Sequence, residues 1–262
     1  MSDDFYIGYE PRQPSDLARF VSVSSALLLF VAVATAAVLS ASQDEPAEAR
    51  FEYGVSRTYD GVVRIDPYPR LDLSDGSTIL LVSEFMHGAN EAVLNYVGQH
   101  ITVSGSLIER QRLRMLEIDA QSIVREDAGM PAAAMTAAGA DAPTAPAAPA
   151  APDERGAPEP VTVQGELLDG KCFLGVMKPG EGTVHRACAR LCLRGGIPAL
   201  IAFVEAGGRA RTALVTFGSD VPLAEEYLRF VGRPVEATGS YDPAAAGGIG
   251  VFTVDPSTIR IL

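Results

Sequence analysis

The chain has no tryptophan, few other aromatic residues and a shortage of basic ones. Aromatic residues make up 7% of its 262 residues, and 21 Lys+Arg stand against 33 Asp+Glu, giving a formal net charge of -12. A nucleic-acid partner requires a basic surface, so this composition argues against one. Sparse aromatics also leave no platform for stacking bases or sugars. The charge suits a solvated protein surface instead.

Catalytic motifs are missing as well. The sequence contains no GxSxG, HExxH, Walker or GxGxxG pattern and no convincing nucleophile–base pair. Among its three cysteines there is no Cys-x-x-Cys and no Cys-x-x-Cys-His, so thioredoxin-like exchange and c-type haem attachment both lack their usual motif. We therefore expect a non-catalytic protein.

One long apolar run stands near the start of the chain. Residues 20–42 (FVSVSSALLLFVAVATAAVLSAS) carry no charge, and about 20 apolar residues cross a bilayer as a helix. Arg12 and Arg19 precede the run and acidic residues follow it, which predicts a cytoplasmic tail over 1–19 and a periplasmic remainder. We expect a single-pass protein of a bacterial inner membrane, with the lipid bilayer as a partner. A cleaved signal peptide, processed near 40–42, is the alternative, but the length of the run favours an anchor.

The rest of the chain contains an internal repeat. The segment TILLVSEFMHGANEAVLNYVGQHITVSGSL, which begins at Thr78, aligns without gaps with TALVTFGSDVPLAEEYLRFVGRPVEATGSY, which begins at Thr212. Each copy opens on a similar strand (DGVVRIDP and QGELLDGK) and closes on another (LEIDAQSIV and FTVDPSTIRIL). Self-similarity of this kind predicts two copies of one structural unit.

Each copy has the order strand, strand, short helix, strand, turn and strand. Alternating apolar residues mark the strands, and apolar residues at helical spacing mark the helix. A five-stranded barrel with a helix between its third and fourth strands is the arrangement of an OB-fold. In this pattern the chain resembles small periplasmic bacterial OB-fold proteins, a resemblance of architecture that implies no functional residue. We expect a mainly β protein, with a transmembrane helix over 20–42 and OB-like barrels over 50–126 and 161–262.

Residues 127–160 separate the two copies and consist largely of alanine and proline. Proline blocks a stable helix and favours extended polyproline II structure, so this segment is interpreted as a semi-rigid linker. At about 3.1 Å per residue it is long enough to hold the second barrel far from the first.

The second copy is the longer one, and its extra residues lie between its first two strands and hold all three cysteines. Cys172 stands apart, whereas His185, Cys188 and Cys192 follow at intervals of three and four residues. This spacing places the last three on one face of a helix. OB-folds commonly place binding loops in this connection, so this segment is the candidate site.

Three interpretations of the cysteines stay open. Cysteines outside the cytoplasm usually pair, which favours a disulfide from Cys172 to Cys188 or Cys192 and no bound cofactor. Alternatively, Cys172, His185, Cys188 and Cys192 form an acceptable tetrahedral zinc site, and Met177 adds a soft ligand that would favour copper as Cu(I). The third interpretation is a redox-active or haem-linked thiol.

Basic residues gather in the same segment of an otherwise acidic chain. They are Lys171, Lys178, Arg186, Arg190 and Arg194. The three arginines recur every four residues, so they form a stripe beside the cysteine face of the helix. Such a stripe is either an ordinary solvated face or a docking patch for an acidic partner or an anionic ligand.

Two functions follow from these observations. The first is a non-catalytic accessory or assembly subunit of a membrane complex, for example a respiratory one, which docks through the second barrel to other subunits. The alternative is a periplasmic metal- or cofactor-handling protein that uses the Cys/His cluster and Met177. An enzyme with a thiol mechanism ranks behind both.

Overall fold

A computed structural model of the chain describes residues 14–42, 48–125, 160–204, 210–217 and 223–262. The chain divides into two compact units, residues 1–47 and 48–262. The predicted linker over 127–160 lies outside the described residues except for Pro160, and so does most of the predicted tail over 1–19.

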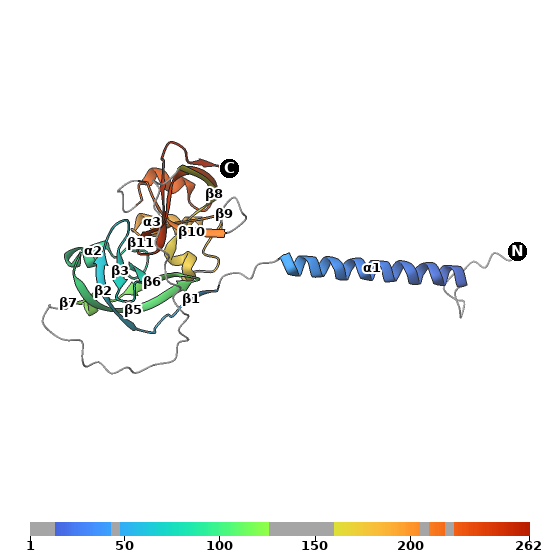
Figure 1. Ribbon diagram of the computed structural model, residues 1–262, viewed down its shortest axis with the longest axis horizontal. Helices are drawn as coiled ribbons and strands as arrows, with labels where there is room; N and C mark the ends of the chain where they lie inside the picture. Colours follow the sequence, from blue (N-terminus) through green and yellow to red (C-terminus); the bar gives the residue numbers. More distant parts are fainter. Residues whose placement is uncertain (1–13, 43–47, 126–159, 205–209, 218–222) are drawn as a thin grey trace. The chain divides into compact units, whose positions relative to one another are not determined.

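The apolar run forms the helix α1 (Ser15–Ser42), which has 28 residues (Figure 1). At about 1.5 Å per residue this exceeds the hydrocarbon thickness of about 30 Å. The helix begins at Ser15 rather than at residue 20, so its first turns also include the charged residues Asp16 and Arg19. Among the described residues, α1 is the one helix long and apolar enough to cross a membrane.

The first barrel has five strands that close on themselves. Its strands β4 and β6 pair in parallel, all other neighbours pair antiparallel, and β5 pairs with both β2 and β6 to close the barrel. Short helical turns connect β4 to β5, and two short strands extend β5. The elements are β1 (Ala49–Phe51), β2 (Arg57–Arg64), β3 (Arg70–Leu73), β4 (Thr78–Val82), α2 (Asn90–Val93), η1 (Leu94–Tyr96), β5 (His100–Arg110), β6 (Leu113–Ile118), η2 (Ala120–Ser122) and β7 (Val124–Arg125).

The second barrel repeats this order of strands. Its third and fifth strands, β10 and β12, pair in parallel, and β11 closes the barrel against β8 and β12. The insertion between β8 and β9 adds η3 and α3. The elements are β8 (Pro160–Asp169), η3 (Cys172–Val176), α3 (Arg186–Arg194), β9 (Ala199–Val204), β10 (Ala210–Thr216), η4 (Glu225–Phe230), β11 (Pro234–Ala246), β12 (Ile249–Val254) and β13 (Arg260–Ile261). The predicted fold class, mainly β with two OB-like barrels, is confirmed.

The two copies agree at the level of single hydrogen bonds. In the first barrel the Ser122 hydroxyl accepts the backbone N–H of Ser104 at 2.9 Å. In the second barrel the Thr258 hydroxyl accepts the backbone N–H of Thr238 at the same distance. These residues occupy equivalent positions in the sequence repeat, so the repeat corresponds to a duplicated structural unit.

The barrels are in contact with one another. Strand β4 is buried on both faces: Ile79 and Leu81 pack inside the first barrel, whereas Leu80 and Val82 join a cluster made mostly of second-barrel residues. The Tyr68 hydroxyl also donates to the carbonyl of Val215, at 2.7 Å. The segment 127–160 is long enough to hold the barrels far apart, but the two barrels pack against each other. The apolar outer face of β4 would otherwise lie in water, and the second barrel covers it.

Candidate metal centre

The candidate site lies in the insertion between β8 and β9. Its first part, η3, contacts β1, β5 and β6 of the first barrel as well as β8 of its own barrel. In Figure 1 this yellow segment lies between the green strands of the first barrel and the orange strands of the second. The insertion is therefore part of the contact between the barrels and not a loop that projects away from them.

The end of β8 positions the first cysteine. One carboxylate oxygen of Asp169 accepts the backbone N–H of Cys172 at 2.8 Å, which fixes the start of the π-helical turn η3. Gly175 has a φ of +150°, and a Cβ there would lie 2.9 Å from the backbone nitrogen of Arg50. Glycine therefore lets the turn approach the first barrel closely.

The helix α3 positions the other three predicted ligands. His185 is its N-cap residue, and Cys188 and Cys192 follow on the inward side with Ala189 and Leu193. The helix ends at Arg194. The N–H of its C-cap residue, Gly195, donates to the carbonyl of residue 191, and Gly196 follows with a φ of +88°. The three- and four-residue spacing thus places these side chains on one helical face, as predicted.

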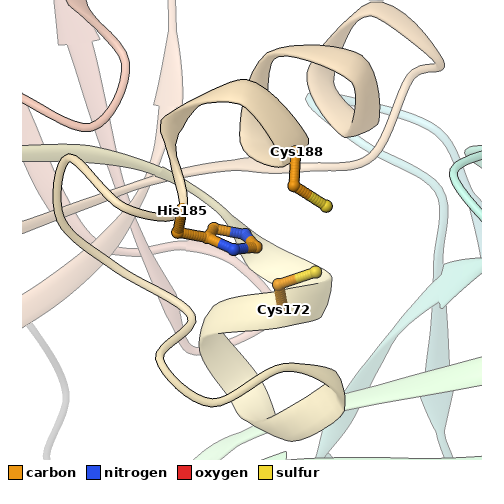
Figure 2. A group of neighbouring side chains, drawn as sticks. All are labelled: Cys172, His185 and Cys188. Carbon is orange, nitrogen blue, oxygen red and sulfur yellow. The ribbon is translucent and has the colours of Figure 1, made fainter.

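The ligand atoms of Cys172, His185 and Cys188 converge, and Cys192 lies beside Cys172 in a second group that contains neither His185 nor Cys188. Figure 2 shows the sulfur of Cys172, from η3, and that of Cys188, from α3, turned toward each other beside the imidazole of His185. The ligand atoms of these three residues lie within 4.8 Å of one another, and Asp169, Cys172 and Cys192 form a second, overlapping group within the same limit. The side chains of Cys172, His185 and Cys192 are buried. All three cysteines are free thiols in the structure.

Asp169 is the residue that sequence reasoning missed. Its carboxylate is fully buried, and one oxygen lies 2.8 Å from Nε2 of His185. When Nε2–H donates to this carboxylate, Nδ1 carries the lone pair that a metal requires. A signal was present in the repeat, because the equivalent position of the first copy is Ile65, which packs against an apolar core. A carboxylate at a core-facing position indicates a buried polar partner.

The thiols interact with one another. The hydrogen bond between Cys172 and Cys192, together with burial, raises the pKa of the Cys172 thiol, and the same hydrogen bond lowers the pKa of the Cys192 thiol. Burial raises the pKa of the Cys188 thiol. Thiolates in this buried cluster require a cation beside them to offset their charge.

The donor set suits a thiophilic metal ion. In a tetrahedral zinc site with Zn–S bonds of about 2.3 Å, two sulfur ligands stand about 3.8 Å apart, a spacing that fits within the observed cluster. Three sulfurs and one imidazole nitrogen suit Zn²⁺ or Cu(I), and Asp169 supplies the carboxylate that orients a ligating histidine. Three of the four side chains are buried, which suits a closed structural centre better than an open catalytic one.

Two further predicted site residues, Met177 and Lys171, differ in their exposure. The Met177 side chain is 45% exposed, whereas Cys172 and Cys192 are buried and Cys188 is partly buried. Lys171 is only 2% exposed, so it does not belong to an exposed docking patch, and that expectation is corrected. Its ammonium group donates to first-barrel carbonyls, which no local sequence pattern reveals.

The other basic residues of the insertion face solvent at least in part. Arg194 forms a two-point ion pair with Glu225 of η4, with a shortest distance of 2.6 Å, and Arg190 lies 3.9 Å from the same carboxylate. Lys178 is exposed and Arg186 is half-buried. Glu225 therefore offsets part of the charge of the arginine stripe, which favours an ordinary solvated face.

No protein-family model matches the chain, and neither a curated protein nor a solved structure matches it.

Proposed function

We propose that the chain is a membrane-anchored metal-binding protein whose second barrel holds one Zn²⁺ ion. The ligands are Cys172, His185, Cys188 and Cys192, and Asp169 orients the histidine. The observation that carries this proposal is the convergence of thiols from two separate elements on a histidine whose other nitrogen faces a buried carboxylate. That arrangement is typical of a metal site with its supporting shell.

A disulfide accounts for fewer of these residues. A bond from Cys172 to Cys188 or Cys192 uses two thiols and leaves the third thiol and His185 without a role in the cluster. Coordination uses all three thiols and the histidine, and it explains why a carboxylate is buried here. The geometry therefore favours the metal site over the disulfide that the sequence alone favoured.

Zinc stoichiometry and thiol counting distinguish the two. For the full chain purified in detergent, native mass spectrometry should show one zinc ion per chain. Alkylation under denaturing, chelating conditions without reductant should then label all three cysteines, because thiolate ligands become free when the metal leaves. A zinc-free chain in which only one cysteine is labelled would show a disulfide and refute the proposal.

We also infer that α1 anchors the chain in a bacterial inner membrane, with a cytoplasmic N-terminus and both barrels in the periplasm. The exposed apolar side chains of α1 support the membrane anchor. The arginines at positions 12 and 19 support the orientation. A reporter that is active only in the periplasm, fused after Leu262, should be active. If instead a reporter that works only in the cytoplasm is active at this position, the inferred orientation is wrong.

A second candidate function is that of an accessory subunit of a membrane complex, and an exposed aromatic residue favours it. Phe85 is 80% exposed and has a φ of +59°, so the loop after β4 holds an aromatic ring out in solvent beside Met86. Apolar side chains displayed in this way are common at protein–protein contacts. Purification in a mild detergent tests this role, because a subunit should copurify with its complex and Phe85→Ser should release it.

A further inference from the structure

Lys171 is a buried cation that connects the insertion to the first barrel. Its ammonium donates to the carbonyls of Ser83 and Phe85, at 2.9 and 2.6 Å, and forms an ion pair with Glu117. These acceptors come from the loop after β4 and from β6. An ammonium group has three N–H donors, so the first barrel supplies a partner for each of them.

The position of Lys171 in the chain links this contact to the metal site. Lys171 immediately precedes Cys172, and Asp169, two residues earlier, holds both Cys172 and His185. A movement of η3 that carries Cys172 away from α3 also carries the ammonium away from its acceptors. A buried charge without its partners is strongly destabilising, so loss of these contacts would be costly.

Two further contacts join the insertion to the first barrel. Arg110, at the end of β5, donates to the carbonyl of Phe173 at 3.0 Å, and its guanidinium lies 4.1 Å from the centre of that ring. At the other end of the insertion, the N–H of Gly88 donates to the carbonyl of Gly195 at 2.9 Å. Thus η3 and the end of α3 both touch the first barrel.

The two helical elements are too short to hold this arrangement by themselves. The turn η3 has five residues and α3 has nine, whereas isolated helices shorter than about 12–15 residues are marginal in water. Leu174 of η3 and Ala189 and Leu193 of α3 are all buried in the same apolar core. The cluster adds a cross-link, because one ligand comes from η3 and three come from α3 or its cap.

We propose that the metal centre is a clasp between the barrels: a bound ion joins η3 to α3 and so keeps Lys171 and Gly195 in contact with the first barrel. Removal of the ion releases these contacts while each barrel stays folded. The inference rests on the proposed zinc site but goes beyond it, since a zinc ion could be bound without any effect on the first barrel.

Hydrogen exchange at Gly88 reports directly on the clasp, because its amide N–H donates to the carbonyl of Gly195 across the contact between the first barrel and the insertion. The zinc-loaded full chain in detergent is compared with the same protein after chelation under reducing conditions. We expect the Gly88 amide to exchange about tenfold faster after chelation, with amides inside β5 unchanged. If chelation accelerates exchange only within 172–194 and Gly88 keeps its protection, the clasp is refuted and the zinc site stands. A chain that binds no zinc refutes both.

Variants separate the lysine from the metal. Lys171→Met should keep one zinc ion per chain and still show faster exchange at Gly88, whereas Lys178→Met, an exposed lysine of the same insertion, should change neither. Arg110→Gln is the second variant, for use if Lys171→Met does not fold, and it too should accelerate exchange at Gly88 with zinc retained. Unchanged Gly88 protection in the folded variants would overturn the proposal.

Discussion

Replacing Cys172 with serine is expected to empty the metal centre. Cys172 is the one predicted ligand on η3, so the remaining ligands all belong to α3 or its cap and no longer join two elements. Bound zinc should fall from about one equivalent per chain to a small fraction of it, measured by elemental analysis of the purified protein. Because the free energy of metal binding contributes to folding, the unfolding temperature should fall by about 10 °C or more.

Met177→Leu is the matched control for this variant. It also removes a sulfur atom from the insertion, five residues away, but its side chain is 45% exposed. Zinc content and unfolding temperature should stay at the wild-type values. Loss of zinc from Met177→Leu, with zinc retained in Cys172→Ser, would show that the ligand set has been assigned incorrectly.

Asp169→Asn is expected to weaken zinc binding by about 10- to 100-fold while the protein stays folded. The asparagine side chain has the same shape, and its carbonyl oxygen can still accept the N–H of Cys172. Its amide group then faces Nε2 of His185 as a donor, which makes Nε2 an acceptor and moves the ring proton to Nδ1. A protonated Nδ1 cannot bind the metal, so the histidine is lost as a ligand. Competition with a chromogenic chelator measures the change in affinity.

Asp119→Asn provides the comparison for this second variant. Asp119 caps the turn η2 in the first barrel by accepting the backbone N–H of Gln121, so it is also a carboxylate that holds a turn. It has no contact with the cluster, and zinc affinity should not change. Equal affinities in wild type and Asp169→Asn would contradict the role assigned to the carboxylate.

The sequence predicts the barrels well because it contains the same unit twice. The gapless alignment from Thr78 and Thr212 identified the strands and the connecting helix, and the hydrogen bonds of Ser122 and Thr258 confirm the correspondence. The length difference between the copies located the insertion. Both inferences depend on local patterns, which a single sequence displays directly.

The contact between the barrels could not be predicted in the same way. The sequence places Lys171 with the other basic residues of the insertion, because its acceptors, at positions 83, 85 and 117, lie far away in the sequence. The role of Asp169 likewise could not be predicted, because it depends on the fold placing His185 beside its carboxylate. The run TILLV in β4 did carry a signal, since an uninterrupted apolar strand is buried on both faces. What covers such a face depends on tertiary packing.

The separation of the strand pairings along the chain sets an order of assembly. Every pairing of the first barrel lies between Ala49 and Arg125, whereas the cluster needs residues from Asp169 to Cys192. Since domains generally fold in the order of synthesis, the first barrel can be complete before any metal ligand has emerged. The carbonyls of Ser83 and Phe85, which accept from Lys171, would then be in place before Lys171 is synthesised. On the proposed zinc site, metal binding would be the last step of maturation, and a shortage of zinc would leave the first barrel folded with the cluster empty.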